Sequence, residues 1–209
     1  MEPQEKTKNA WAGYSKKDEE HLNLERRWAK QNYKILKKLN IVPCERILDI
    51  GCSHGFFLKI CKENRCQING IDIDPNIVDG KIVKKCNVET DRFPFDDNTF
   101  DVIFSSGLVQ HLSKPPMNFM EEIHRVLKPG GKFCMVVRNE KSWINILFSL
   151  YDNFRHKSTW SPMSLKQMLE YYKFKVIFMQ PKFLGIGWFW WVPFKWHIGS
   201  NVFIVGQKM

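Results

Sequence analysis

The chain has 209 residues, a formal net charge of +10 and 44% hydrophobic residues. This length suits one sizeable core rather than two, and the hydrophobic content is ordinary for a soluble globular domain. Its apolar runs are too short for a membrane span, and the polar start "MEPQEKTKNAW" lacks the apolar segment of a secretory signal. We therefore expect one cytoplasmic domain over residues 1–209.

The excess positive charge is spread unevenly along the chain. Residues 140–209 carry nine Lys or Arg against three Asp or Glu, whereas residues 46–139 are nearly neutral. This excess predicts either a solvated basic face or a surface that meets an anionic partner. The six cysteines form no C-x-x-C pair. They are therefore expected to be reduced, partly buried thiols rather than a zinc ribbon or a redox motif.

Helical and strand-like patterns alternate along the first two thirds of the chain. A charged amphipathic helix is predicted over residues 18–39. Short runs rich in Ile, Val and Phe are typical of parallel strands buried on both faces, and they occur at 46–50, 68–73, 101–106 and 131–137. Helical patterns lie between them over 55–64 and 115–131, and Pro129-Gly130-Gly131 ends the second.

The last third predicts one more helix and two closing strands. Ser161 is suited to cap a helix over 161–172, with Pro162 at its first position. Residues 174–180 and 201–208 have strand patterns, with no convincing helix between them. The fold expected is therefore α/β: a Rossmann-like sheet of about seven strands, mostly parallel, with an antiparallel C-terminal edge pair and helices on both faces.

The stretch "ILDIGCSHGFF" (47–57) places Asp49, Gly51 and Gly55 where a buried strand turns into a helix. Glycines at such a turn let the backbone pass close to a ligand, which then faces the free N–H groups of the helix start. A dinucleotide motif would put its second and third glycines at Ser53 and Phe56, and the Gly-Lys-Ser/Thr of a P-loop is absent. A carboxylate before the loop suits a ligand with a positive end, such as an ammonium.

A second carboxylate follows at the end of the next predicted strand. Asp72 ends the next predicted strand, 21 residues after Gly51. In sheets of this kind a carboxylate about 20 residues on holds a ribose diol. Together the two strand ends indicate a ligand with both a charged end and a ribose.

Four motifs in this order resemble those of class I S-adenosylmethionine-dependent methyltransferases of the broad small-molecule type. They are "ILDIGCSHGFFL", "INGIDIDPN", "NVETDRFPFDDNTFDVIFSSGLVQHL" and "EEIHRVLKPGGKFCMVV", and they span residues 44–139, with a weaker tail to 209. The resemblance divides the chain into an N-terminal helical lid or extension (1–43), a cofactor-binding core (44–139) and a C-terminal region with the last strands on the substrate side (140–209).

The resemblance implies a site for S-adenosylmethionine. Asp49 and the loop after it would hold the amino-acid end, and Asp72 the ribose. Asn87 stands where the family usually has an Asp that accepts from the adenine amino group, a bond that an amide oxygen can also accept. The residues implied to hold the cofactor are Asp49, Gly51, Cys52, Ser53, Gly55, Asp72, Ile73, Asn87, Val88 and Ser105.

Two departures from the family pattern stand out. Ser53 takes the middle position of the tight loop, where its Cβ would cost affinity if the backbone needs a positive φ. The second helix is short, because "PNIVDGKIVKK" leaves barely a turn before the next strand.

His111 is the candidate catalytic residue. It follows the fourth predicted strand, at the carboxyl edge where such sheets bind ligands, and would act as a base if the acceptor must lose a proton. The alternative is a histidine that bonds to backbone. His54 is expected to face solvent, and Tyr14 either covers the cofactor or lies in a surface turn. The spacing of the other histidines suggests no metal site.

The segment "GWFWWVPFKW" (187–196) holds four of the eight tryptophans. A core strand would alternate, and this segment does not. We consider a lid over an apolar acceptor, a membrane-interface patch or a dimer contact. Trp190 and Trp191 are the candidate acceptor contacts, with Lys182 and Lys195 meeting an anionic group.

The expected function is S-adenosylmethionine-dependent methyl transfer to a small, lipid-like or glycan-linked acceptor. Peripheral contact with an anionic membrane would suit the basic aromatic segment. Two alternatives are an RNA methyltransferase that uses the basic surface and a non-catalytic domain that binds the cofactor or a partner. Nucleic acid is the less favoured partner, because the sequence has no added RNA-binding domain.

Overall fold

A computed structural model describes residues 19–74, 82–113, 115–139, 142, 160–182 and 200–209. Tyr14, Trp190, Trp191 and Lys195 lie outside these residues, as does most of the short segment predicted before the third strand. The roles predicted for them therefore remain predictions. None of the described helices is both long and apolar enough to cross a membrane.

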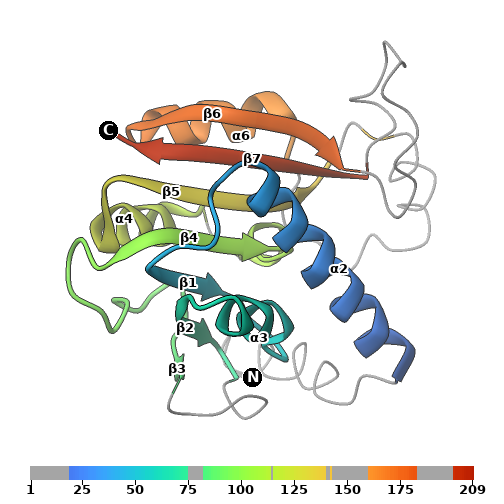
Figure 1. Ribbon diagram of the computed structural model, residues 1–209. Coiled ribbons are helices and arrows are strands. Elements are labelled where there is room, and N and C mark those ends of the chain that lie inside the picture. The colour runs from blue at the N-terminus through green and yellow to red at the C-terminus, as the bar shows by residue number, and fades with distance from the viewer. Residues whose placement is uncertain (1–18, 75–81, 114, 140–141, 143–159, 183–199) are drawn as a thin grey trace, which may run out of the picture.

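Seven strands of the described chain form one sheet in the order β3-β2-β1-β4-β5-β7-β6 (Figure 1). Strands β3, β2, β1, β4 and β5 run parallel, whereas β7 runs antiparallel to both β5 and β6. The predicted mixed sheet with an antiparallel C-terminal pair is confirmed. The strands are β1 (Arg46–Ile50), β2 (Gln67–Asp72), β3 (Val83–Lys85), β4 (Phe100–Ser106), β5 (Leu127–Arg138), β6 (Phe174–Lys182) and β7 (Asn201–Lys208).

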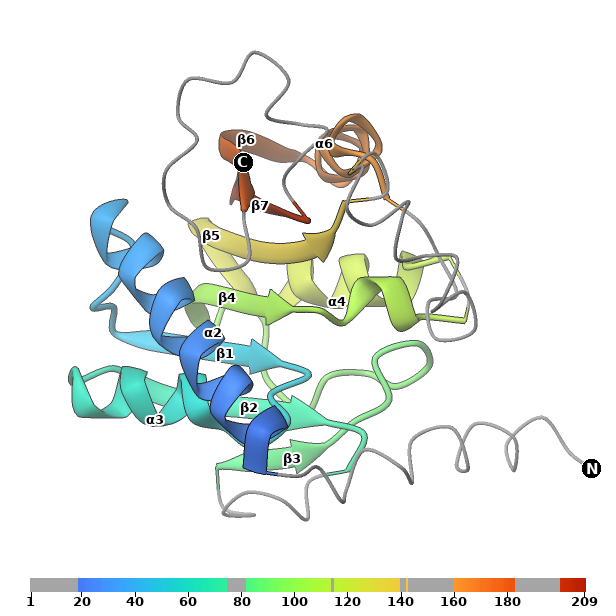
Figure 2. The same ribbon diagram turned by 90° about the vertical axis from the view of Figure 1, so that its right-hand side faces the viewer.

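Helices cover both faces of the sheet (Figures 1 and 2). Helices α2 (Glu19–Lys38) and α3 (Phe56–Glu63) pack side by side on one face. Helices α4 (Met117–Val126) and α6 (Pro162–Tyr171) cover the other. The short 3-10 helix η2 (Val109–His111) follows β4 at the carboxyl edge of the sheet.

Alternating side chains of the central strands supply two hydrophobic cores. Ile47 of β1 packs with α2 and α3, whereas Leu48 and Ile50 of the same strand join the core under α4 and α6. All three are fully buried. A strand buried on both faces needs apolar residues at successive positions, which is the pattern that predicted a parallel sheet.

The start of α6 follows its local sequence pattern, whereas the end of α4 does not. Ser161 caps α6 by accepting a hydrogen bond from the Ser164 backbone N–H at 3.1 Å, and the Ser161 backbone N–H donates to the Ser164 hydroxyl at 2.9 Å. Helix α4 ends earlier than predicted, at Val126, because Leu127 already pairs with Phe100 of β4. Strand pairing across the sheet thus takes over before Pro129 can end the helix.

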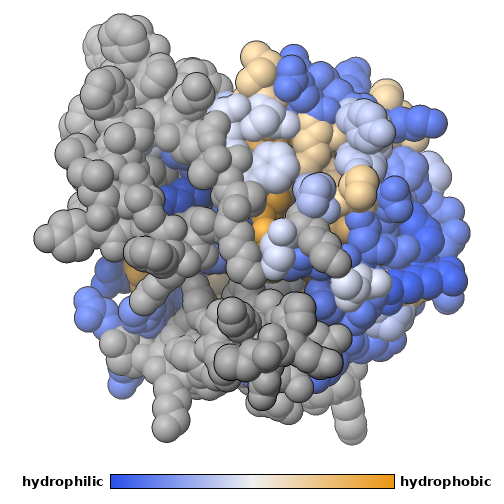
Figure 3. Space-filling view, turned by 180° about the vertical axis from the view of Figure 1, so that it is seen from behind, coloured by the Kyte–Doolittle hydropathy of each residue, from blue (hydrophilic) through white to orange (hydrophobic). Residues whose placement is uncertain are grey.

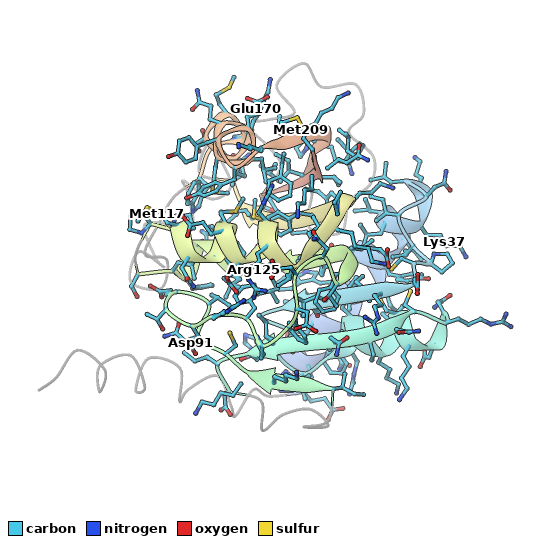
Figure 4. All side chains as sticks on the ribbon, turned by 90° about the vertical axis from the view of Figure 1, so that its left-hand side faces the viewer. Lys37, Asp91, Met117, Arg125, Glu170 and Met209 are labelled. Carbon is cyan, nitrogen blue, oxygen red and sulfur yellow. The ribbon has the colours of Figure 1, made fainter. Side chains whose placement is uncertain are left out.

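Arg125 ties α4 to the chain segment before β4, and Figure 4 labels it near the middle of that view. Its guanidinium donates to Glu122 at 2.7 Å, to Asp97 at 2.7 Å and to the carbonyls of Phe93 and Phe95. The pKa of Glu122 is held below its usual value, first by the hydrogen bond from Arg125. Seen from behind, the described surface is mostly hydrophilic, with apolar residues near its middle (Figure 3).

Candidate active site

A pocket opens where β1, β2 and β4 end side by side. The three strands run parallel and in register, with Asp49 beside both Gly70 and Phe104, so that their carboxyl ends meet at one edge. The pocket has a volume of about 440 Å³, within the range of small-molecule sites. Of the residues predicted to bind cofactor or acceptor, Asp49, Gly51, Cys52, Ser53, Asp72, Ile73, Asn87, Val88 and His111 line it.

The loop after β1 has the left-handed backbone that a close approach to a ligand requires. The φ angles are +72° at Gly51, +46° at Ser53 and +67° at Gly55. The positive φ favours glycine at position 51, and a Cβ there would also lie close to the Leu108 side chain, at 3.3 Å. Ser53 is the exception, because a residue with a side chain occupies the left-handed region.

Asp49 is an almost fully buried carboxylate, 4% exposed, at the base of the pocket. Burial, and secondarily the charge of Asp72, raises its pKa to about 8. No described residue donates a hydrogen bond to this carboxyl or forms an ion pair with it. Because a buried, uncompensated carboxylate is costly, the position favours a ligand that brings a positive charge or hydrogen-bond donors.

Asp72 is held in place by the backbone of two loops. One carboxylate oxygen accepts from the Ser53 N–H at 2.9 Å and the other from the Asp74 N–H at 3.0 Å. These bonds fix the carboxylate at the end of β2, between the glycine loop and the next turn. The side chain is therefore preorganised to accept further hydrogen bonds, for example from a diol.

The next part of the wall comes from the residues that follow β2 and β3. Ile73 is 40% exposed and offers an apolar surface beside the pocket. The Asn87 side-chain oxygen accepts from the Glu89 N–H at 3.1 Å, and one lone pair of that oxygen is left over. The predicted contact with an adenine amino group is compatible with this geometry and stays a prediction.

Two residues differ from the sequence-based picture. Gly55 does not line the pocket but stands at the start of α3 as its N-cap. The Ser105 hydroxyl donates to the Ile50 carbonyl at 3.2 Å inside the sheet, and the adjacent Ser106 and Gly107 line the pocket. A backbone carbonyl near Ser105 that faces the methionine end of the cofactor stays a prediction. His54 does not face solvent, because its side chain is only 17% exposed and bonds to Glu25 of α2 at 2.9 Å.

Sequence reasoning missed the wall that α2 contributes. Glu25, Trp28, Ala29 and Asn32 of this helix line the pocket. The side chain of Asn32 is 2% exposed, so a polar residue on the buried face was the available signal. Helical periodicity identifies such a face but not the element that it packs against.

Two further residues lie at the other side of the pocket. His111, at the end of η2, lines the pocket as predicted. Its neighbour Gln110 is 7% exposed, and the Gln110 amide oxygen has no hydrogen-bond partner among the described residues. Within the described ranges, no group of three His, Cys, Asp or Glu side chains could hold a metal ion.

Comparison with known proteins identifies the fold and a domain match in the middle of the chain. Residues 48–135 match the family described as a methyltransferase domain. The fold is similar to that of a Thermotoga maritima S-adenosylmethionine-dependent methyltransferase described as a possible histamine N-methyltransferase, with a TM-score of 0.71 and 18% identity over 96% of this chain and 99% of that one. Residues 48–135 thus match a methyltransferase domain, and the described fold is that of S-adenosylmethionine-dependent methyltransferases.

Two curated relatives each match about half of the chain. The chain is 33% identical over 115 residues to a sterol 4-C-methyltransferase of Caenorhabditis elegans, which covers 48% of this chain and 33% of that protein. It is 34% identical over 104 residues to phosphoethanolamine N-methyltransferase 3 of Arabidopsis thaliana, covering 45% and 21%. The chain thus spans a third or less of these two relatives.

Family and fold imply S-adenosylmethionine as the cofactor, and the pocket suits this molecule. Asp49 offers a buried carboxylate for the ammonium, and Asp72 a fixed acceptor pair for the ribose. The left-handed glycine loop leaves room for the backbone to approach the cofactor. When bound, S-adenosylmethionine supplies a methyl group activated by a sulfonium.

Proposed function

We propose that this methyltransferase transfers a methyl group from S-adenosylmethionine to a small acceptor. The observation that carries the proposal is the pair of carboxylates at neighbouring strand ends, Asp49 buried without a partner from the described residues and Asp72 fixed by two backbone N–H groups. Such a pair fits a ligand with an ammonium at one end and a ribose in the middle. The protein's own task is then to align the acceptor and to exclude water.

The walls of the pocket support an acceptor with apolar character. Aromatic and aliphatic side chains from several parts of the chain line the pocket: Trp28, Phe56, Phe57, Ile73, Val88, Phe104, Leu108 and Leu112. Trp28 stays 38% exposed at the side formed by α2, which leaves apolar surface for a further ligand. We propose a lipid-like acceptor on this basis. Two relatives are named as a sterol 4-C-methyltransferase and a phosphoethanolamine N-methyltransferase, and both names agree with this class of acceptor.

Charge argues against RNA as the favoured acceptor. The described lining of the pocket contains five carboxylates and neither lysine nor arginine, although the whole chain carries +10: Glu25, Asp49, Asp72, Asp74 and Glu89. Carboxylates repel a phosphate backbone, and nucleic-acid sites are usually lined by lysine and arginine. An uncharged or cationic methyl-accepting end is therefore expected to bind better than an anionic one.

Cofactor binding tests the assignment most directly. Purified protein should bind S-adenosylhomocysteine in calorimetry, and Asp72→Ala should weaken this binding by about 1–3 kcal/mol, because charge-assisted hydrogen bonds are lost. Asp96→Ala, which removes an exposed carboxylate outside the pocket, is the matched control and should change nothing. Absence of binding by the wild type, or equal affinity in Asp72→Ala, would refute the cofactor site.

The acceptor is then sought with tritiated S-adenosylmethionine. Lipid, metabolite and RNA pools are incubated separately with the enzyme, and label is followed into each fraction. The proposal predicts label in the lipid or metabolite fraction. Label confined to RNA would overturn the acceptor class while leaving the cofactor site intact.

A further inference from the structure

One residue of the cofactor loop is held in a conformation that its side chain disfavours. Ser53 has φ +46°, in the left-handed region, where residues with a Cβ are less stable than glycine by roughly 1–2 kcal/mol. Gly51 and Gly55 on either side adopt the same region without this cost. Something in the surrounding structure must therefore keep Ser53 there.

Two contacts anchor Ser53. Its backbone N–H donates to Asp72 at 2.9 Å, and that bond places the loop against the ribose carboxylate. Its hydroxyl lies 3.2 Å from His54 Nδ1. The backbone contact joins Ser53 to the site itself, and the side-chain contact joins it to the neighbouring imidazole.

The imidazole of His54 is in turn fixed by α2. Its Nδ1 lies 2.9 Å from the Glu25 carboxylate, and both side chains are 17% exposed. A carboxylate only accepts, so Nδ1 carries the hydrogen and donates it to Glu25, with the Ser53 oxygen as a second, longer acceptor. The His54 ring also stacks on Phe56 at 5.8 Å, and the Arg26 guanidinium lies 4.9 Å from the Phe56 ring.

We propose that Glu25 and His54 are positioning residues that hold Ser53, and with it the cofactor loop, in the binding conformation. Helix α2 thereby sets the shape of the loop through the contact of Glu25 with His54. The inference rests on the proposed function only in naming the ligand that the loop serves. The serine that departs from the family's glycine pattern is compensated by a contact 29 residues away in the sequence.

A rescue experiment separates positioning from ordinary packing. If the contacts of His54 with Ser53 and Glu25 serve to hold Ser53, they become dispensable when Ser53→Gly removes the backbone strain at position 53. His54→Ala should weaken S-adenosylhomocysteine binding about five- to tenfold in the otherwise wild-type chain, because roughly one net hydrogen bond is lost. In the Ser53→Gly background the same change should cost less than twofold.

Conservative variants test the atom responsible. In His54→Asn the side-chain nitrogen can occupy the place of Nδ1 and should preserve most of the affinity. His54→Gln places its nitrogen further out, at the place of Nε2, and should behave like His54→Ala. Glu20→Gln, which removes an exposed carboxylate from the same helix, is the control and should stay within twofold of the wild type.

The same variants are measured without ligand by urea unfolding. His54→Ala should raise the unfolding equilibrium constant less in the Ser53→Gly background than in the Ser53 background. If His54→Ala changes stability and affinity equally in both backgrounds, the proposed positioning role of Glu25 and His54 is wrong. Because the urea measurement needs no ligand, it tests the positioning role of Glu25 and His54 even if the wild type binds no S-adenosylhomocysteine. Absence of that binding would count against the proposed function alone.

Discussion

Replacing His111 with alanine is expected to lower turnover by about 10²–10⁴ while the affinity for S-adenosylhomocysteine stays within twofold. His111 lies at the end of η2 and lines the pocket. As a base it would take the proton that the acceptor loses when its new bond to the methyl carbon forms and the electron pair of the carbon–sulfur bond passes to sulfur. The measurement is single-turnover transfer of tritium to the acceptor found in the labelling experiment.

The pH profile distinguishes a base from a histidine that only supports η2. With a base, wild-type turnover rises as pH increases through the histidine pKa, and His111→Ala loses this limb. His111→Gln keeps a polar side chain but cannot take a proton, so it should be as slow as His111→Ala. A fall of less than threefold in both variants would assign His111 a structural role.

Replacing Asp49 with asparagine is expected to weaken S-adenosylhomocysteine binding by roughly 10- to 100-fold and to abolish proton release on binding. Burial raises the Asp49 pKa to about 8, so the carboxyl of the free protein is mostly protonated at pH 7. An ammonium favours the charged form, and the wild type should therefore release up to about one proton per site. Calorimetry at pH 7 in two buffers of different ionisation enthalpy measures this release.

Asp49→Asn is expected to weaken ligand binding but to stabilise the ligand-free protein at high pH. Because the folded-state pKa of Asp49 is raised, the folded protein binds more protons than the unfolded chain, and stability is lost as pH rises from about 4 to about 8. Asp49→Asn removes this loss. Without ligand, it should unfold at a higher temperature than the wild type at pH 8 and show a smaller advantage at pH 5. Equal pH dependence in both proteins would contradict the predicted titration.

Burial decided both of these expectations about Asp49, and burial is a property of the tertiary structure. The sequence places a carboxylate before a glycine loop, which suffices to predict a cofactor with a positive end. It does not show that no described residue neutralises that carboxylate, or that Asp72 lies close enough to raise its pKa further. The chemistry of the residue was predictable, but its protonation state was not.

Local patterns alone determined the order and type of the main elements. Buried parallel strands such as β1 need successive apolar residues, amphipathic helices such as α4 need helical spacing, and Ser161 and Pro162 mark a helix start. Positive φ at Gly51 also follows locally, because the turn from strand to helix is tight there. These features depend on residues close together in the chain, so the sequence carries them directly.

Only the tertiary structure decided which distant residues meet. Strand β7 inserts between β5 and β6, α2 forms a wall of the pocket, and Glu25 reaches His54 across the glycine loop. Ser105 points into the sheet while Ser106 reaches the pocket, because successive side chains of a strand alternate and the sheet's packing chooses the face. Such contacts depend on how elements dock, and docking is selected by the total burial and pairing of the whole chain rather than by any one segment.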